Sequence, residues 1–296
     1  MWYNTPFRHD PGRAGDEATR AFMAEAGLDP NGNLMAIGCG KQTRNLLMPL
    51  VEGEEPGEEI VSSDNNDGNG PIIRLAPLPL FCVASSEQEC MDMARRSSRS
   101  THTGLGAAES AAFLAFAIQR AINRPVAGKR GLEGEPIRTF LDGVTAEFAA
   151  SCPHDDLKRL LSGEGEPEDS KELMWNWKAE QLEITKTIAN RGDDYNGHGP
   201  TAPHYCGAYA LDGLAMALWA VYRSTSTADA IITCANLLGD ADSTAAVAGQ
   251  LAGAFYGAAD VDPRLVALLR RWDPEQEMVA RAVLLLVQSC ERSALC

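Results

Sequence analysis

A cluster of oxygen-bearing side chains lies in the last third of the chain. Asp240 and Asp242 are one residue apart, and Ser243 follows directly. In a loop before a helix, this spacing lets both carboxylates turn toward one point, and the hydroxyl adds a neutral oxygen. Such ligands suit Mg²⁺, Mn²⁺ or Ca²⁺ rather than zinc. The alternative is that Asp242 or Ser243 only caps the following helix, and for so short a motif the cap is the simpler interpretation.

The glycines downstream of these acids strengthen the metal interpretation. Gly249, Gly253 and Gly257 recur every four residues, so a helix over residues 241–257 carries them on one face. Another helix can pack closely against such a face. A buried helix that starts in a polar loop directs its positive end, and any anion bound there, toward the interior. The pattern therefore predicts an interior polar site at residues 240–243.

Other candidate binding residues lie earlier in the chain. Gly68-Asn69-Gly70 sits in a cluster of loop-forming residues, and backbone amides of small residues can approach phosphates closely. The alternative for this tripeptide is an ordinary turn. His102, before an alanine-rich stretch, could contact a ligand, cap the helix or be solvated. Tyr209 could stack on a ligand or be a core aromatic, and Arg74 could pair with phosphate or form a structural ion pair.

Taken together, these segments resemble the ADP-ribosylglycohydrolase family. Residues 236–243 read Asn-Leu-Leu-Gly-Asp-Ala-Asp-Ser, and the small-residue helix that follows ends in Gly-Gln-Leu-Ala-Gly-Ala-Phe-Tyr-Gly, which is similar to the family's C-terminal signature. Residues 68–77, 100–102 and 206–214 resemble further family segments in the same order. The resemblance runs from about residue 60 to the C-terminus and is weaker before it.

The resemblance implies a fold, a cofactor and a site. The fold is an orthogonal all-α helical bundle that holds two divalent cations, usually Mg²⁺, with Mn²⁺ as the alternative. Residue by residue it implies that Asp240, Asp242 and Ser243 bind metal. It implies that ADP-ribose is bound by Gly68, Asn69, Gly70, His102 and Tyr209. The implied reaction removes ADP-ribose from modified protein side chains or small ADP-ribosyl compounds, and the catalytic acid is not identified.

The sequence departs from the family pattern in its N-terminal part. Family members carry a Gly-Asp-Ala-x-Gly helix and a Ser/Thr-Asp-Asp-Thr segment that supplies the other half of the metal site, and neither is found here. Asp155-Asp156 and Asp193-Asp194 are acid pairs in the wrong order. We therefore expect a single domain over residues 1–296 that is N-terminally truncated and has little activity. The alternative function is a non-catalytic ADP-ribose-binding or structural protein on the same scaffold.

The elements that must position these residues are predicted to be helices. Apolar residues recur at spacings of three and four, and no strand-like alternation persists. Helices are expected at residues 16–26, 107–122, 205–222, 227–237, 241–257, 263–271 and 274–290. The helix at 107–122 is expected to bury one face, and 205–222 to be buried all round. Pro263 and Pro274 are expected in first turns. The prediction is an all-α protein.

Composition narrows the class of protein. The chain has 296 residues and a net charge of −15, which disfavours binding to nucleic acid or to an anionic membrane. The best candidate for a membrane span, residues 205–222, contains Asp212. Eight dispersed cysteines and no visible signal peptide favour reduced thiols in a cytoplasmic protein. The expected partner is ADP-ribose or an ADP-ribosylated protein.

Overall fold

The computed structural model describes residues 67–124, 136–163, 176–182, 184, 206–270 and 273–294. The chain divides into two units, Met1–Val61 and Ser62–Cys296, and every described residue belongs to the second. The single domain over residues 1–296 therefore stays a prediction. The helix expected at 16–26 and the acid pair Asp193-Asp194 lie outside the described residues.

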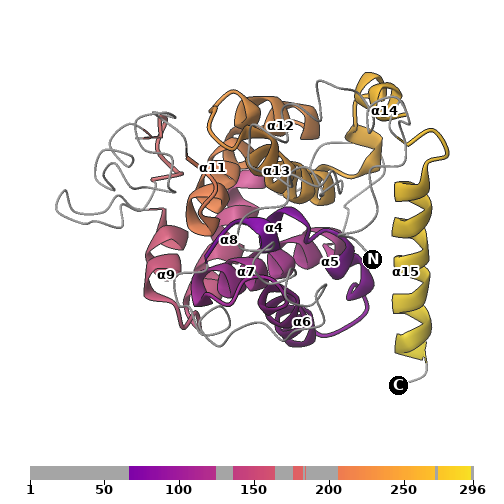
Figure 1. Ribbon diagram of the computed structural model, residues 1–296, viewed down its shortest axis with the longest axis horizontal. Coiled ribbons are helices and arrows are strands. Elements are labelled where there is room, and N and C mark those ends of the chain that lie inside the picture. The colour runs from indigo at the N-terminus through magenta and orange to yellow at the C-terminus, as the bar shows by residue number, and fades with distance from the viewer. Residues whose placement is uncertain are drawn as a thin grey trace, which may run out of the picture. The chain divides into compact units, whose positions relative to one another are not determined.

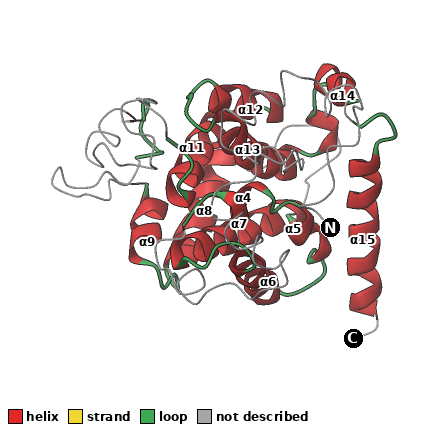
Figure 2. Ribbon diagram, in the orientation of Figure 1, coloured by secondary structure: helices red, strands yellow, loops and turns green. Residues whose placement is uncertain are grey.

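The regular elements of the described residues are helices, as Figure 2 shows. One isolated antiparallel bridge, between Gly68 and Tyr209, is the only strand-like pairing in this part of the chain. The all-α prediction is confirmed. The helices are α4 (Gly70–Ile73), α5 (Pro77–Phe81), α6 (Glu87–Arg99), α7 (Leu105–Asn123), α8 (Ile137–Ala149), α9 (Asp155–Ser162), α11 (Ala210–Arg223), α12 (Thr227–Ala235), α13 (Ala241–Tyr256), α14 (Pro263–Leu269) and α15 (Glu277–Ala294).

Helix α7 forms the centre of the core. It packs against α6, α11, α13, α4 and α5 (Figure 1), and it is buried on all sides rather than on the single face expected from the sequence. Its alanines allow this, because small side chains let neighbouring helices approach closely. Among the described residues α7, not the segment at 205–222, is the helix long and apolar enough to cross a membrane. Because 83% of its most apolar window is buried, its apolar character is that of a core helix.

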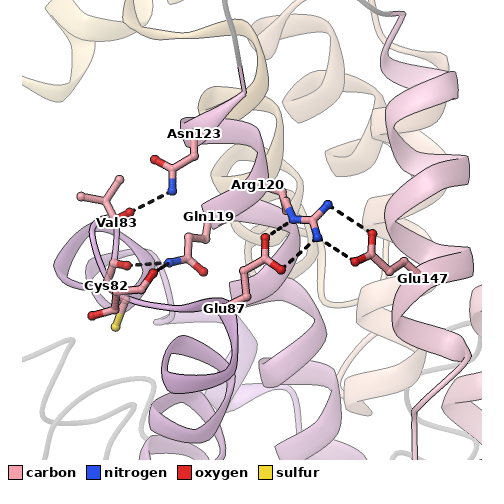
Figure 3. A network of polar contacts seen from close by, with 8 residues as sticks. Cys82, Val83, Glu87, Gln119, Arg120, Asn123 and Glu147 are labelled. Atoms are coloured by element: carbon pink, nitrogen blue, oxygen red, sulfur yellow. Dashed lines mark hydrogen bonds and ion pairs between the residues drawn. The ribbon is translucent and has the colours of Figure 1, made fainter.

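The last turns of α7 carry polar side chains that fix its neighbours (Figure 3). The amide of Gln119 donates to the carbonyl of Cys82 at 2.6 Å, at the end of α5. The guanidinium of Arg120 pairs with Glu87 of α6 and, at 2.7 Å, with Glu147 of α8. These contacts set the register of α7 against three other helices, which matters because the start of α7 lies at the candidate site.

Two predicted helix starts are wrong. The helix expected from residue 205 begins at Ala210, because the preceding segment pairs with Gly68 instead of coiling. The last helix begins at Glu277 rather than Pro274, because the carboxylate of Asp273 accepts hydrogen bonds from the first backbone N–H groups of α15. Pro263 does lie in the first turn of α14. The central burial of α11 is confirmed.

The glycine face of α13 packs against α12, as expected. A Cβ on Gly249 would lie 3.2 Å from Ile231 of α12, so the close approach depends on glycine there. A Cβ on Gly253 would have its nearest neighbour, the methyl group of Thr227, at 4.0 Å. Gly257, with φ +82°, ends α13. Of the three glycines, close helix packing therefore depends on Gly249.

Candidate functional site

The segment that precedes α4 lies beside the segment that precedes α11. Gly68 and Tyr209 form the antiparallel bridge, and the N–H of Ala210 donates to the carbonyl of Asp67 at 2.8 Å. Tyr209 has extended backbone angles, is half-buried and stands at the N-cap of α11. It therefore precedes the apolar helix rather than lying inside it, and its side chain packs against the hydrophobic core. The pairing brings two of the predicted binding elements, the glycine loop and Tyr209, to one place.

Asn69 joins this pair of segments to the acidic start of α13. Its side-chain amide donates to the carbonyl of Gly207 at 2.9 Å and to Oδ2 of Asp240 at 2.5 Å. An amide NH₂ group has two hydrogens, so both are used within the protein. Asn69 is also buried. Both of its side-chain N–H groups are therefore used within the protein, and one of them orients Asp240.

The acids at the start of α13 do not cap that helix. By its backbone Asp240 is the N-cap residue, but its carboxylate accepts no hydrogen bond from the first turn. Asp242 and Ser243 lie inside the first turn, so the alternative that one of them is the N-cap is wrong. Asp242 is exposed, whereas Asp240 and Ser243 are half-buried. All three side chains thus lie at one helix terminus, and none of them serves as its cap.

A strained turn places Asp240. Leu238 and Gly239 both have φ of +66°, the left-handed region. The N–H of Asp240 donates to the carbonyl of Cys206 at 2.8 Å. A Cβ on Gly239 would lie 2.4 Å from that same carbonyl oxygen, so only glycine fits. Burial and, next, the charge of Asp240 raise the pKa of Cys206 to about 11, which keeps its thiol neutral.

His102 lies between α6 and α7 and packs against the glycine loop. It is 4% exposed and precedes the N-cap residue Gly104, so it is neither solvated nor a cap. A Cβ on Gly70 would lie 2.5 Å from Cε1 of its ring, which explains the glycine. Burial, followed by the positive charge of Arg74, lowers the pKa of His102 to about 4. The ring is therefore neutral at pH 7.

Two residues that hold the site's elements together and one buried acid were given no role from the sequence. Oδ1 of Asp67 accepts from the N–H of Ala107 at 2.7 Å and so caps α7 from another segment. Gln250 of α13 donates to the carbonyls of Ile72 and Ile73 at 3.0 Å each and so holds α4. Asp212 is a fully buried acid in the first turn of α11. The sequence did hint at its burial, because Asp212 is an acid inside an otherwise apolar stretch.

The side chains at the start of α13 fit part of a magnesium site. Asp240, Asp242 and Ser243 offer the hard oxygen donors that Mg²⁺ prefers. Within the part of the chain that the structure describes, no group of three or more His, Cys, Asp or Glu side chains is placed to hold a metal ion. Water and groups outside the described residues would have to complete the octahedral shell of Mg²⁺. The metal-binding and ADP-ribose-binding roles of the predicted residues stay predictions.

Comparisons with known proteins give local and overall matches. A stretch of 58 residues is 55% identical to the ADP-ribosylarginine hydrolase Tri1 of Pseudomonas putida (strain GB-1), covering 20% of this chain and 16% of that protein. A stretch of 134 residues is 31% identical to Tri1 of Serratia proteamaculans (strain 568), covering 42% and 35%. The uncharacterized protein YegU of Escherichia coli (strain K12) is 26% identical over 234 residues, covering 76% and 63%. The chain therefore spans less than two thirds of each of these relatives.

A solved structure and a family description cover most of the chain. The structure, an ADP-ribosylglycohydrolase-related protein complex, has a TM-score of 0.56 and 29% identity, covering 84% of this chain and 69% of that one. Residues 6–293 match the sequence model of the ADP-ribosylglycohydrolase family. This match begins well before residue 60, where the motif resemblance begins. On the strength of this match and the shared helical fold, the chain belongs to the ADP-ribosylglycohydrolase family.

Proposed function

We propose that this protein removes ADP-ribose from modified arginine side chains in a magnesium-dependent hydrolysis. Family membership supports hydrolysis of an ADP-ribosyl bond. Two relatives with local matches are ADP-ribosylarginine hydrolases, which favours arginine over serine or a small-molecule ester. In this reaction the oxygen of water bonds to C1″ of the distal ribose as the bond to the guanidino nitrogen breaks, and the leaving nitrogen takes up a proton.

The observation that carries the proposal is the bridge made by Asn69. Its amide connects the glycine loop, expected beside the pyrophosphate, to Asp240, expected beside the metal. Asp240, Asp242 and Ser243 would hold Mg²⁺, which when bound would supply positive charge close to the breaking bond. Tyr209, paired with Gly68, would stack on the adenosine or ribose part of the ligand.

The metal arm of the test uses calorimetry. The double variant Asp240→Asn/Asp242→Asn is expected to lose most of its Mg²⁺ and Mn²⁺ affinity. A matched control is Asp155→Asn/Asp156→Asn, because these two acids also lie in the first turn of a helix, α9. The control should bind metal like the unaltered protein. Unchanged metal affinity in the first double variant would show that the metal assignment is wrong.

The activity arm follows ADP-ribose release, in the presence of Mg²⁺, from protein modified on arginine and from protein modified on serine. Release from arginine and not from serine is expected, at the low rate that the sequence predicts, and it should be lost in Asp240→Asn/Asp242→Asn. A thermal shift with ADP-ribose, reduced in Tyr209→Ala, would report binding separately. Binding without release would support the alternative of a non-catalytic ADP-ribose-binding protein. No shift at millimolar ADP-ribose would contradict the binding site itself.

A further inference from the structure

Three side chains form a connected series that ends at the glycine loop. Nη2 of Arg74 donates to Oγ1 of Thr101 at 2.7 Å, and Oγ1 of Thr101 lies 2.9 Å from Nδ1 of His102. Thr101 and His102 are 6% and 4% exposed, so water does not compete freely for these contacts. Nη2 of Arg74 also donates to the carbonyl of Ser97 at 2.9 Å, which holds the guanidinium at the end of α6.

The donors and acceptors of this series fix the position of one proton. A guanidinium can only donate, so Thr101 accepts from Arg74. The Thr101 hydroxyl has a single hydrogen, and among the described residues the acceptor it meets is Nδ1 of His102. If Nδ1 carried the proton instead, the threonine hydrogen would be left without an acceptor in a buried place, which is unfavourable. Nδ1 therefore accepts, and the neutral ring carries its proton on Nε2.

The Cε1–Nε2 side of the His102 ring lies against the glycine loop. The Cβ position of Gly70 lies 2.5 Å from Cε1, 3.1 Å from Nε2 and 3.4 Å from Nδ1. We propose that Arg74 and Thr101 are positioning residues that hold His102 as a neutral donor with its proton on Nε2, directed at the bound ADP-ribose. The last step, donation to ADP-ribose, rests on the proposed function, whereas the tautomer does not.

The tautomer is measured without any ligand by long-range ¹H–¹⁵N correlation spectra of the ¹⁵N-labelled full chain at pH 7. The His102→Gln variant identifies which signals belong to this ring. The two ring nitrogens should differ widely in shift, with Nε2 in the protonated range and Nδ1 in the unprotonated range. A ring with its proton on Nδ1, or with averaged shifts, would overturn the proposal.

Variants test whether Arg74 and Thr101 are responsible. Thr101→Val and Arg74→Met should both reduce the separation of the two nitrogen shifts, and Thr101→Ser should restore it. Ser100→Ala is a matched control, because Ser100 also contacts Arg74, at 3.4 Å, but does not contact the ring. It should leave the shifts unchanged. If the two nitrogen shifts are equally far apart in Thr101→Val, Arg74→Met and the unaltered protein, and all three fold, then Arg74 and Thr101 do not position the ring.

Binding measurements separate this inference from the proposed function. Thr101→Val should weaken ADP-ribose binding about tenfold while Thr101→Ser binds normally, as expected for the loss of one hydrogen bond to a charged ligand. If the tautomer is as proposed but ADP-ribose does not bind, the positioning of His102 by Arg74 and Thr101 stands and the proposed function fails. If ADP-ribose binds and Thr101→Val changes neither the nitrogen shifts nor the affinity, this positioning fails and the proposed function stands.

Discussion

Replacing Gly239 by alanine should damage the candidate site through the backbone alone. Gly239 has φ +66°, and an added Cβ would lie 2.4 Å from the carbonyl oxygen of Cys206. That oxygen accepts the hydrogen bond from the N–H of Asp240 at 2.8 Å. A methyl group has no rotamer by which to avoid the contact, so the turn must move away from Cys206 and take Asp240 with it.

The cost follows from three contributions. A non-glycine residue in the left-handed region costs roughly 1–2 kcal/mol. Weakening the hydrogen bond of Asp240 to Cys206 costs about 1 kcal/mol. The reduced freedom of the unfolded chain returns about 0.4–1 kcal/mol. The net loss of unfolding free energy is about 2 kcal/mol, or roughly 4–8 °C in the melting temperature of a domain of 150–250 residues.

Urea denaturation and thermal melting measure the loss, and Gly253→Ala is the matched control. Gly253 lies inside α13, and its added Cβ would meet only the Thr227 methyl group, at 4.0 Å. In a helix interior alanine is about 0.5–1 kcal/mol better than glycine, so this variant should be more stable than the unaltered protein. Gly239→Ala should also weaken Mg²⁺ binding, which Gly253→Ala should not.

The reasoning is refuted if Gly239→Ala melts within a degree or so of the unaltered protein. It is also refuted if the two alanine variants lose the same stability, because the argument depends on the surroundings of each glycine rather than on glycine itself. If Gly239→Ala is destabilised but binds Mg²⁺ normally, the turn at Gly239 contributes to stability and not to metal binding.

Three further predictions concern charge. The pKa of His102 is about 4 in the folded state against the ordinary 6.5, so as the pH falls the unfolded chain takes up this proton before the folded one does. The folded state therefore has its full stability above pH 6.5 and loses at most about 3 kcal/mol of it as the pH falls toward 4. Urea melts of His102→Gln should therefore depend less on pH in that window, and an identical slope would contradict the assignment. Arg95→Met should lower the free energy of unfolding, measured in urea, by about 3–5 kcal/mol, because the buried Glu109, which pairs with Arg95 at 2.7 Å, loses its partner. The double variant Arg95→Met/Glu109→Leu should recover most of this loss, and no recovery would contradict this cause. Arg120→Met should lower the free energy of unfolding by about 1 kcal/mol or less, because the side chains of Arg120 and its two partners are 35–56% exposed. High salt should reduce this loss further, and a loss that does not depend on salt would exclude the ion pairs as its cause.

The sequence was sufficient for features that depend on neighbouring residues. The spacing of apolar and small residues predicted α7 and α13 to within two residues at each end. Local patterns also placed Pro263 in a first turn and Gly249 on a packed helix face. Such features are determined by side chains three and four positions apart, and the sequence displays these directly.

Features that depend on distant segments required the tertiary structure. The segment at 206–209 reads as helix, but it is extended because it pairs with Gly68. The amide of Asn69 is committed to Asp240, 171 positions away in the chain. The sequence allows His102 to be a ligand contact, a cap or a solvated residue, and only the structure shows that it is buried against Gly70. A buried polar group must find a partner wherever the fold supplies one. The sequence therefore indicated candidate polar residues, whereas the packing of the helices decided which protein partner each one binds.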